Sequence, residues 1–464
     1  MLFNTTGFFI FLAVVLALFY TSPRGLRKYI LLAASYFFYG SWNYKFIALL
    51  LTLTAIDYTA GIWLERVPPG PRKKAVLILS LCANLGFLGF FKYYNFLADN
   101  VALLLARPPH SFFLQIVLPL GISFHTFQSM SYVVDVYRGE QQAVRNPVDY
   151  ALFICFFPQL VAGPIVRARN FFHDLWNWQP PASEDLARGV MLLVLGLTKK
   201  MAFADQFARV ANDYFKNSAT NPGMLTAWSG VVAFGLQIYF DFSGYTDMAI
   251  GMAKLLGFHF PVNFRRPYLA ASITDFWRRW HISLSTWLRD YLYISLGGNR
   301  RGRWMTYRNL MLTMLLGGLW HGASWNFVIW GGFHGALLSL ERAFRGNRRV
   351  SERWDWLYPF QAAGTFALVT VSWVFFRAAD LPQSLAIVRQ MFGGGAGHLL
   401  FANWHIELIA IALVLAVVEE KFEWFERVLR APILAYASVL ALMLFSIEVF
   451  GVIDERIPFV YFQF

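Results

Sequence analysis

Long apolar runs alternate with short basic segments along the whole chain. A membrane-spanning helix needs about 20 mostly apolar residues, because the hydrocarbon core of a bilayer is roughly 30 Å thick. The runs that meet this description lie at 5–20, 29–43, 46–63, 75–91, 186–203, 225–240, 324–341, 362–377, 404–420 and 433–452. The pattern therefore predicts an all-α, polytopic membrane protein.

Other apolar stretches are interrupted by glycine, proline or polar residues, and they lie at 113–134, 150–165, 244–257 and 305–319. Irregular or half-crossing segments exist at membrane depth when protein surrounds them. Pro158, Gly163 and Pro164 predict a broken element, and Gly244 predicts a second one. Because no long linker or low-complexity segment is present, we expect a single membrane domain over residues 1–464.

Composition and charge support the membrane interpretation. The chain is 57% hydrophobic and 14% charged, whereas soluble domains carry roughly a quarter charged residues. The net charge of +13 comes from basic residues clustered between apolar runs, for example at 24–28, 66–74 and 342–353. Such clusters mark cytoplasmic loops, so we expect an N-terminus on the outside and no nucleic-acid partner.

The segment 274–303 breaks the apolar pattern and combines tryptophans with arginines. Read as one helix, it places Trp277 and His281 on the same face. One interpretation is an amphipathic helix that lies in the membrane interface. The other is a helix that closes a buried site and offers Arg278 and Arg279 to an anionic donor, such as a pantetheine or nucleotide phosphate.

The segment 315–335 contains His321 next to Trp320, within sequence otherwise suited to membrane depth. An ionisable group there is costly and is by default a functional hypothesis. Imidazole suits proton transfer near neutral pH. The glycine pairs 317–318 and 331–332 allow close backbone approach. A buried histidine that is hydrogen-bonded to a carbonyl remains the alternative.

The other polar groups of the apolar segments give weaker signals. We predict no metal site, because no two of His281, His321 and His334 have the spacing of a zinc-binding helix. No G-x-S-x-G motif indicates a serine nucleophile. His125 reads as a core or pore-lining histidine, and a role for His334 is less expected than one for His321.

Two carboxylates, Asp241 and Asp247, stand in the apolar stretch 237–251. They suggest either a lined cavity or structural ion pairs. Because buried charges normally find partners, we favour structural pairs with Arg265 or Arg266.

Several stretches together resemble the membrane-bound O-acyltransferase family, and most closely its bacterial alginate O-acetyltransferase branch. In order they are SYFFYGSWN (35–43), LPLGISFHTFQSMSYVVDVYRG (118–139), PQLVAGPIVR (158–167), GLTKKMAFAD (196–205), LQIYFDFSGYTDMAIGMAKLLGF (236–258), NFRRPYLAASITDFWRRWHISLSTWLRDYLYISLGGNR (263–300), GGLWHGASWNFVIWGGFHG (317–335) and YFQF (461–464). The chain departs from the usual family pattern at Ser295, where a proline is common, and at His125, where an aromatic residue is more usual.

The resemblance implies a fold of about eleven or more transmembrane helices, with re-entrant and interfacial helices around a central tunnel. The family's invariant histidine falls on His321, and a second motif histidine falls on His281. The implied reaction takes an acetyl group from a cytoplasmic thioester, with acetyl-CoA as donor substrate and no bound cofactor. The acetyl group crosses the bacterial inner membrane to an exported polysaccharide such as alginate, in some relatives with an SGNH-hydrolase-type partner.

We therefore expect His321 to act as general base, with support from Trp280, His281 and Asn326. The residues expected to line the site or contact substrate are Trp277, Arg278, Arg279, Trp280, Trp320 and Asn326. Rival functions are an acyl relay or transporter for another envelope glycan, which includes peptidoglycan or cellulose acetylation and teichoic-acid D-alanylation, and a scaffold for polysaccharide secretion.

Overall fold

The computed structural model describes residues 2–160, 163–345, 355–393, 395–452, 455 and 457–460. The matched ending 461–464 and most of the basic cluster 342–353 lie outside the described residues. The described residues form helices and connecting segments, with no β-strand among them. Their contacts divide the chain into two compact units, which we take in turn. The expected single domain remains a prediction.

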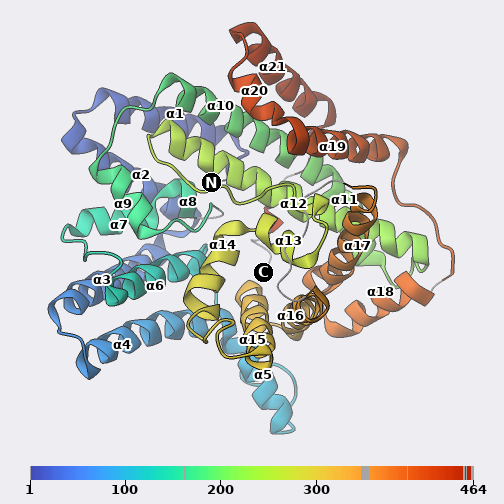
Figure 1. Ribbon diagram of the computed structural model, residues 1–464, viewed down its shortest axis with the longest axis horizontal. Helices are drawn as coiled ribbons and strands as arrows, with labels where there is room; N and C mark the ends of the chain where they lie inside the picture. The colour runs from blue at the N-terminus through green and yellow to red at the C-terminus, as the bar shows by residue number, and fades with distance from the viewer. Residues whose placement is uncertain are drawn as a thin grey trace. The chain divides into compact units, whose positions relative to one another are not determined.

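The first unit comprises residues 1–190 and 248–261. Its helices are α1 (Thr6–Thr21), α2 (Arg24–Asn43), η1 (Tyr44–Phe46), α3 (Ile47–Arg66), α4 (Pro71–Leu88), η2 (Gly89–Tyr93), α5 (Tyr94–Leu104), α6 (Ile122–Arg138), α7 (Pro147–Cys155), α8 (Phe157–Leu160) and α9 (Ala168–Trp176) (Figure 1). Asp57 of α3 is fully buried and accepts hydrogen bonds from Ser80 at 2.6 Å and Asn84 at 2.8 Å. These bonds offset the cost of a carboxylate at membrane depth.

The second unit comprises residues 191–247 and 262–464, so the division falls within α10 and α12. The helices from α10 onward are α10 (Ser183–Thr198), η3 (Lys199–Ala204), α11 (Asp205–Asn217), α12 (Met224–Leu255), η4 (Pro267–Leu269), α13 (Ile273–Arg279), α14 (Ile282–Trp287), η5 (Leu288–Tyr293), α15 (Arg303–His321), α16 (Trp325–Arg345), α17 (Tyr358–Arg377), α18 (Leu381–Gly393), α19 (Asn403–Phe422), α20 (Trp424–Leu429) and α21 (Ile433–Phe450).

Four helical segments of the described chain are long and apolar enough to cross a membrane: Arg24–Arg66, Pro71–Leu104, Tyr358–Arg377 and Ile433–Phe450. Helix α1 is apolar but shorter. Helix α21 has no buried residue and exposes large apolar side chains along its length, as expected of a helix that faces lipid. The all-α, polytopic prediction is confirmed, whereas the number of crossings remains a prediction.

One of the two predicted breaks is present and the other is not. Helix α8 ends at Leu160, and residues 163–167 are not helical. The break predicted at Gly244 is wrong, because α12 continues as one helix of 32 residues. Gly244 instead permits close packing, since a Cβ at this position would lie 2.7 Å from the carbonyl oxygen of Gly196.

The predicted partners of the buried carboxylates are also wrong. Asp241 lies 2.8 Å from the Lys200 ammonium, and Asp247 lies 2.6 Å from that of Lys199. Arg266 instead forms ion pairs with Glu419 and Glu420 of α19. The expected structural role as ion pairs is confirmed, but the two lysines of η3 provide the positive charge.

Candidate active site

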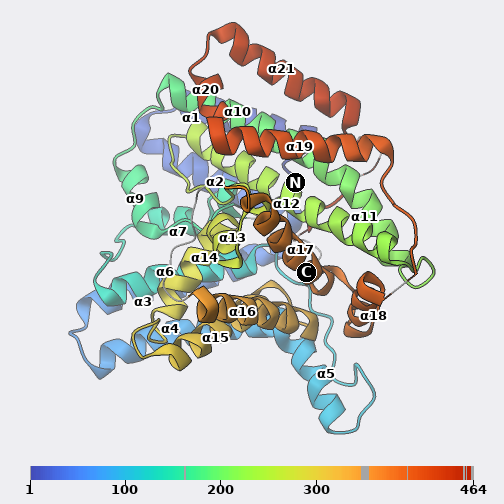
Figure 2. The same cartoon turned by 45° about the vertical axis from the view of Figure 1, so that its right-hand side comes forward.

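Helices α15 and α16 form an antiparallel hairpin that carries His321 at its tip, and the two helices run side by side (Figure 2). The close approach predicted from the glycine pairs is confirmed. A Cβ at Gly318 would overlap the carbonyl oxygen of Phe327, and one at Gly331 would overlap that of Met314. Because residues larger than glycine do not fit at these two positions, the close contact of the two backbones determines where α15 ends.

The His321 side chain is enclosed by aromatic rings. The residue is 6% exposed, and its ring centroid lies 4.9 Å from that of Trp320, 5.1 Å from Trp330 and 5.2 Å from Phe376. An imidazole in such surroundings is held in place and shielded from bulk water. Both properties suit a group that moves one proton within a closed site.

The segment around His281 is not the single helix that its sequence predicts. Helix α13 ends at Arg279, α14 begins at Ile282, and His281 between them has left-handed backbone angles of φ 43° and ψ 54°. The predicted shared face of Trp277 and His281 is therefore wrong. The helix is interrupted because Asn263, a residue from a separate segment, forms hydrogen bonds with the chain at this point.

Asn263 is fully buried, and its side-chain oxygen accepts hydrogen bonds from the Ser283 backbone N–H at 3.0 Å and the Ser283 hydroxyl at 2.9 Å. The same oxygen lies 3.2 Å from Nδ1 of His281. Because an oxygen acceptor faces Nδ1, this nitrogen carries the hydrogen and Nε2 carries the lone pair. Burial lowers the pKa of His281 to about 3, so the ring is neutral.

Trp320 lies between the two motif histidines. Its ring centroid is 6.1 Å from that of His281 and 4.9 Å from that of His321. Trp320 itself is 3% exposed. The structure thus brings together His281, Trp320 and His321, which the sequence placed in two separate motifs.

His334 has a different environment from His321. Its Nδ1 accepts a hydrogen bond from the indole N–H of Trp277 at 3.3 Å, and its Nε2 lies 3.0 Å from the Ser372 hydroxyl. That hydroxyl donates to the carbonyl oxygen of Val369 at 2.7 Å. Both ring nitrogens therefore join α13, α16 and α17, which indicates a structural role for His334 and for Trp277.

Trp280 and Asn326 take part in the packing and hydrogen bonding around the same region. Trp280 is 1% exposed, with its ring centroid 5.6 Å from Phe276 and 5.1 Å from Trp373. The Asn326 amide donates to the carbonyl oxygen of Ala378 at 3.1 Å, which ties α16 to the end of α17. A direct contact of either residue with the reacting atoms remains a prediction.

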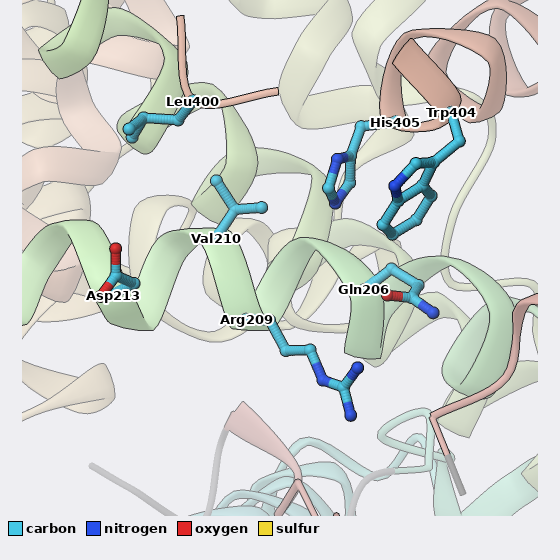
Figure 3. Close-up of a pocket in the computed structure, with 7 residues that line it drawn as sticks. All are labelled: Gln206, Arg209, Val210, Asp213, Leu400, Trp404 and His405. Carbon is cyan, nitrogen blue, oxygen red and sulfur yellow. The ribbon is translucent and has the colours of Figure 1, made fainter. Parts of the chain in front are cut away.

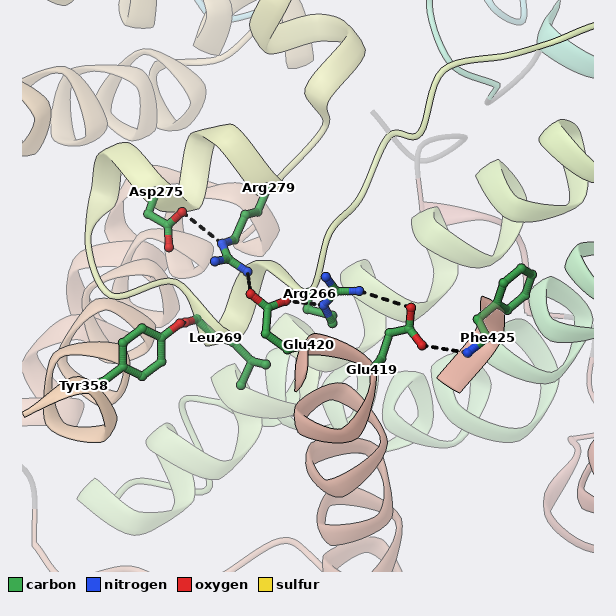
Figure 4. A network of polar contacts seen from close by, with 8 residues as sticks. All are labelled: Arg266, Leu269, Asp275, Arg279, Tyr358, Glu419, Glu420 and Phe425. Atoms are coloured by element: carbon green, nitrogen blue, oxygen red, sulfur yellow. Dashed lines mark hydrogen bonds and ion pairs between the residues drawn. The ribbon is translucent and has the colours of Figure 1, made fainter. Parts of the chain in front are cut away.

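The two arginines of α13 differ in their partners, and Figure 4 shows those of Arg279. Arg279 forms ion pairs with Asp275 at 2.9 Å and with Glu420 at 2.8 Å, and Arg266 also pairs with Glu420. Arg278 is exposed and forms no ion pair within the residues that the structure describes. The charge of Arg279 is already balanced, so Arg278 is the better candidate for contact with an anionic donor.

Sequence reasoning missed Asn263, Trp330 and Phe376. Asn263 stands in one of the matched motifs, but nothing in its spacing shows that it reaches residues 281–283. Trp330 lies in the same motif as His321, but nothing in the sequence shows that its ring contacts the histidine. Phe376 lies far along the chain and meets His321 through the packing of α17 against α16.

Comparison with known proteins agrees with this arrangement. The profile of the membrane-bound O-acyltransferase family matches residues 75–377, and the chain belongs to this family. It is an acyltransferase of the membrane-embedded class.

Relatives carry names from several glycan-modifying systems. The chain is 45% identical to "Probable alginate O-acetylase AlgI" of Azotobacter vinelandii, over 85% of this chain and 79% of the relative. It is 39% identical to the peptidoglycan O-acetyltransferase of Helicobacter pylori, over 85% and 80%. The teichoic acid D-alanyltransferase of Bacillus subtilis is 28% identical, over 58% of this chain and 68% of its own length.

Proposed function

We propose that the protein transfers an acetyl group from a cytoplasmic thioester, acetyl-CoA, for O-acetylation of an exported polysaccharide such as alginate. The observation that carries the proposal is the buried cluster of His281, Trp320 and His321 at the tip of the α15–α16 hairpin. The relatives named as alginate O-acetylases, which match most of the chain, support the choice of polysaccharide.

In the proposed reaction His321 takes the proton of an acceptor hydroxyl while the hydroxyl oxygen attacks the thioester carbonyl. The carbon–sulfur bond then breaks, and the thiolate receives the proton from His321. The products are one acetyl ester and one free thiol. General base catalysis accounts for roughly 10²–10⁴-fold of the rate, and positioning within the aromatic enclosure supplies a further part.

His281 would serve as a positioning residue in this scheme. Its neutral ring, held by Asn263, packs against Trp320 and so fixes the indole that lies next to His321. Arg278 would contact a phosphate of the donor. An arginine forms strong paired hydrogen bonds with phosphate oxygens.

The proposed location is the bacterial inner membrane with the N-terminus outside, on the basis of the basic clusters at 24–28 and 66–74. An SGNH-hydrolase-type protein outside the membrane is the proposed partner that completes transfer to the polymer. Peptidoglycan is the second candidate acceptor, because the Helicobacter pylori relative matches the same share of this chain.

Replacement of His321 tests the assignment. His321→Ala and His321→Gln should lower polysaccharide acetylation at least about 100-fold at matched membrane abundance. His173→Gln is the matched control, since that side chain is 74% exposed. Acetylation retained in both His321 variants would disprove the catalytic role.

A second assay separates an enzyme from a relay subunit. Purified protein receives radiolabelled acetyl-CoA and an acceptor oligosaccharide, with or without the outer partner. Transfer by the chain alone supports direct acetylation. Label that reaches the acceptor only when the partner is also present supports a relay.

A further inference from the structure

A hollow of about 280 Å³ lies between α11 and the start of α19 in the second unit (Figure 3). The residues that line it are Gln206, Arg209, Val210, Asp213, Leu400, Trp404 and His405. Ligand pockets start at roughly 300 Å³, so the hollow has room for one small unit, such as a single sugar ring.

The hollow lies at the opposite end of α19 from the ion-pair network of Figure 4. Helix α19 has 20 residues, and its length of about 30 Å equals the thickness of the hydrocarbon core. Trp404 stands at its first turn and Glu420 at its last. Helix α17, one of the four candidate spans, connects the same two places. Its first residue Tyr358 bonds to Leu269 beside the network, and its last residue Arg377 bonds to Asn212 of α11 at 2.9 Å, so the hollow and the network lie toward opposite ends of a candidate span.

The network end is the cytoplasmic one under the proposed orientation. The basic connection 342–353 leads into α17, and the hydroxyl of Tyr358 in its first turn donates to the carbonyl oxygen of Leu269 at 2.6 Å. Leu269 belongs to η4, directly after Arg266 of the network. The hollow accordingly faces the outside, where an exported polymer is found.

One wall of the hollow is a fixed aromatic surface. Trp404 is 36% exposed, and its ring stacks on that of His405 with centroids 3.6 Å apart. The Ala402 backbone N–H donates to Nδ1 of His405 at 3.1 Å and holds that ring. An exposed, preordered indole is a suitable surface for the apolar C–H face of a sugar ring.

The α11 wall is polar. Arg209 and Asp213 are one helical turn apart, and Gln206 precedes them on the same helix (Figure 3). Arg209 pairs with Glu455 at 3.6 Å, with side chains 40% and 61% exposed. Such an exposed pair is weak, so another carboxylate can replace Glu455 at the guanidinium.

The hollow is also connected to the catalytic region by packing. Val210 and Leu400 pack against the hydrophobic cluster that contains Trp330 and Phe376, and the rings of these two residues contact His321.

From these features we propose that the hollow binds one acidic sugar unit of the exported polysaccharide. The sugar ring stacks on Trp404, its hydroxyls bond to Asp213 and Gln206, and its carboxylate pairs with Arg209. This inference rests on the proposed function, because it takes a uronate-containing polymer as the acceptor.

Binding measurements on the full-length protein in lipid nanodiscs test the inference. Calorimetric titration uses an oligouronate of defined length and a neutral oligosaccharide of equal length. We expect the wild type to bind the oligouronate more tightly. Arg209→Gln should raise its Kd at least about tenfold, the loss expected for a charge-assisted hydrogen bond. Trp404→Ala removes the aromatic surface on which the sugar ring stacks and should also raise the Kd.

Matched controls lie elsewhere on the chain. Trp304→Ala removes an indole that is 85% exposed. Arg389→Gln alters a second hollow of about 400 Å³, which is lined by Leu385, Ala386, Arg389, Gln390 and Gly393 and has no aromatic residue. Both controls should bind the oligouronate as the wild type does.

The inference fails if the wild type does not bind the oligouronate, if the neutral chain binds equally well, or if both hollow variants bind normally. It also fails if the hollow variants weaken only the binding of an outer partner protein. His321→Ala separates the two proposals, since it should bind the oligouronate without acetylating it. Acetylation by His321→Ala would contradict the proposed function, whereas weaker binding by Trp404→Ala would still support the hollow.

Discussion

Replacement of Asn263 by alanine tests how the turn at His281 is maintained. The substitution removes the oxygen that accepts hydrogen bonds from the Ser283 backbone N–H, the Ser283 hydroxyl and Nδ1 of His281. The hydroxyl can rotate, but the other two donors are fixed and buried, and each unsatisfied buried donor costs about 1–3 kcal/mol. We therefore expect the free energy of unfolding to fall by roughly 2–6 kcal/mol if the turn stays as it is.

The turn can instead relax, with a different result. Left-handed backbone angles cost a non-glycine residue about 1–2 kcal/mol, and Asn263 offsets that cost at His281. A relaxed turn moves the ring away from Trp320, so activity falls more than stability does. Either response lowers acetylation, and the pair of measurements shows which one occurs.

The assay combines thermal unfolding of the purified protein in detergent with acetylation measured per folded molecule. Asn177→Ala is the control, because it removes an exposed amide that donates to a backbone carbonyl and should change stability by about 0.5 kcal/mol or less. If Asn263→Ala unfolds at the wild-type temperature and keeps full activity, Asn263 does not position His281.

Three further predictions address other parts of the site. Gly318→Ala should destabilise the α15–α16 hairpin by about 1–3 kcal/mol and lower acetylation, because the added methyl overlaps a backbone carbonyl. Gly86→Ala, with open space around it, should do neither in the same unfolding and acetylation assays. Arg278→Gln should raise KM for the thioester donor in steady-state kinetics with little change in thermal stability; an unchanged KM would remove Arg278 from the donor site. Acidification should destabilise the wild type more than His281→Gln between pH 7 and 4. The unfolded histidine takes up its proton near pH 6.5 and the buried one near pH 3, so unfolding is favoured as the pH falls through that window. Equal loss in both proteins, measured by thermal unfolding at each pH, would contradict a neutral buried His281.

The features that were predictable from sequence are those set by local composition. The lengths of the apolar runs predicted the helices, because the thickness of the bilayer fixes how many residues a crossing needs. The glycines around His321 predicted the close approach of the two hairpin helices, because the absence of a side chain lets two backbones come together. His321 itself was conspicuous for its cost at membrane depth.

The predictions that were wrong depended on side chains from distant segments. Helical periodicity predicted one helix through His281. Periodicity describes one segment only, whereas the buried amide that ends α13 belongs to Asn263 of a different segment. The same holds for Asp241, whose partner Lys200 lies on η3, while Arg266 pairs with Glu420. Gly244 suggested a break, but the helix uses its small size for packing.

The length of α19 has a consequence for the energy of the proposed reaction. With an arginine-rich end on one side and the aromatic hollow about 30 Å away on the other, each reactant can stay in its own compartment. In the proposed reaction the phosphates of the donor would stay outside the hydrocarbon, where each charge would cost several kcal/mol. The group that changes sides would be an uncharged two-carbon unit, so the barrier to its crossing would depend on the shape of the path and not on charge.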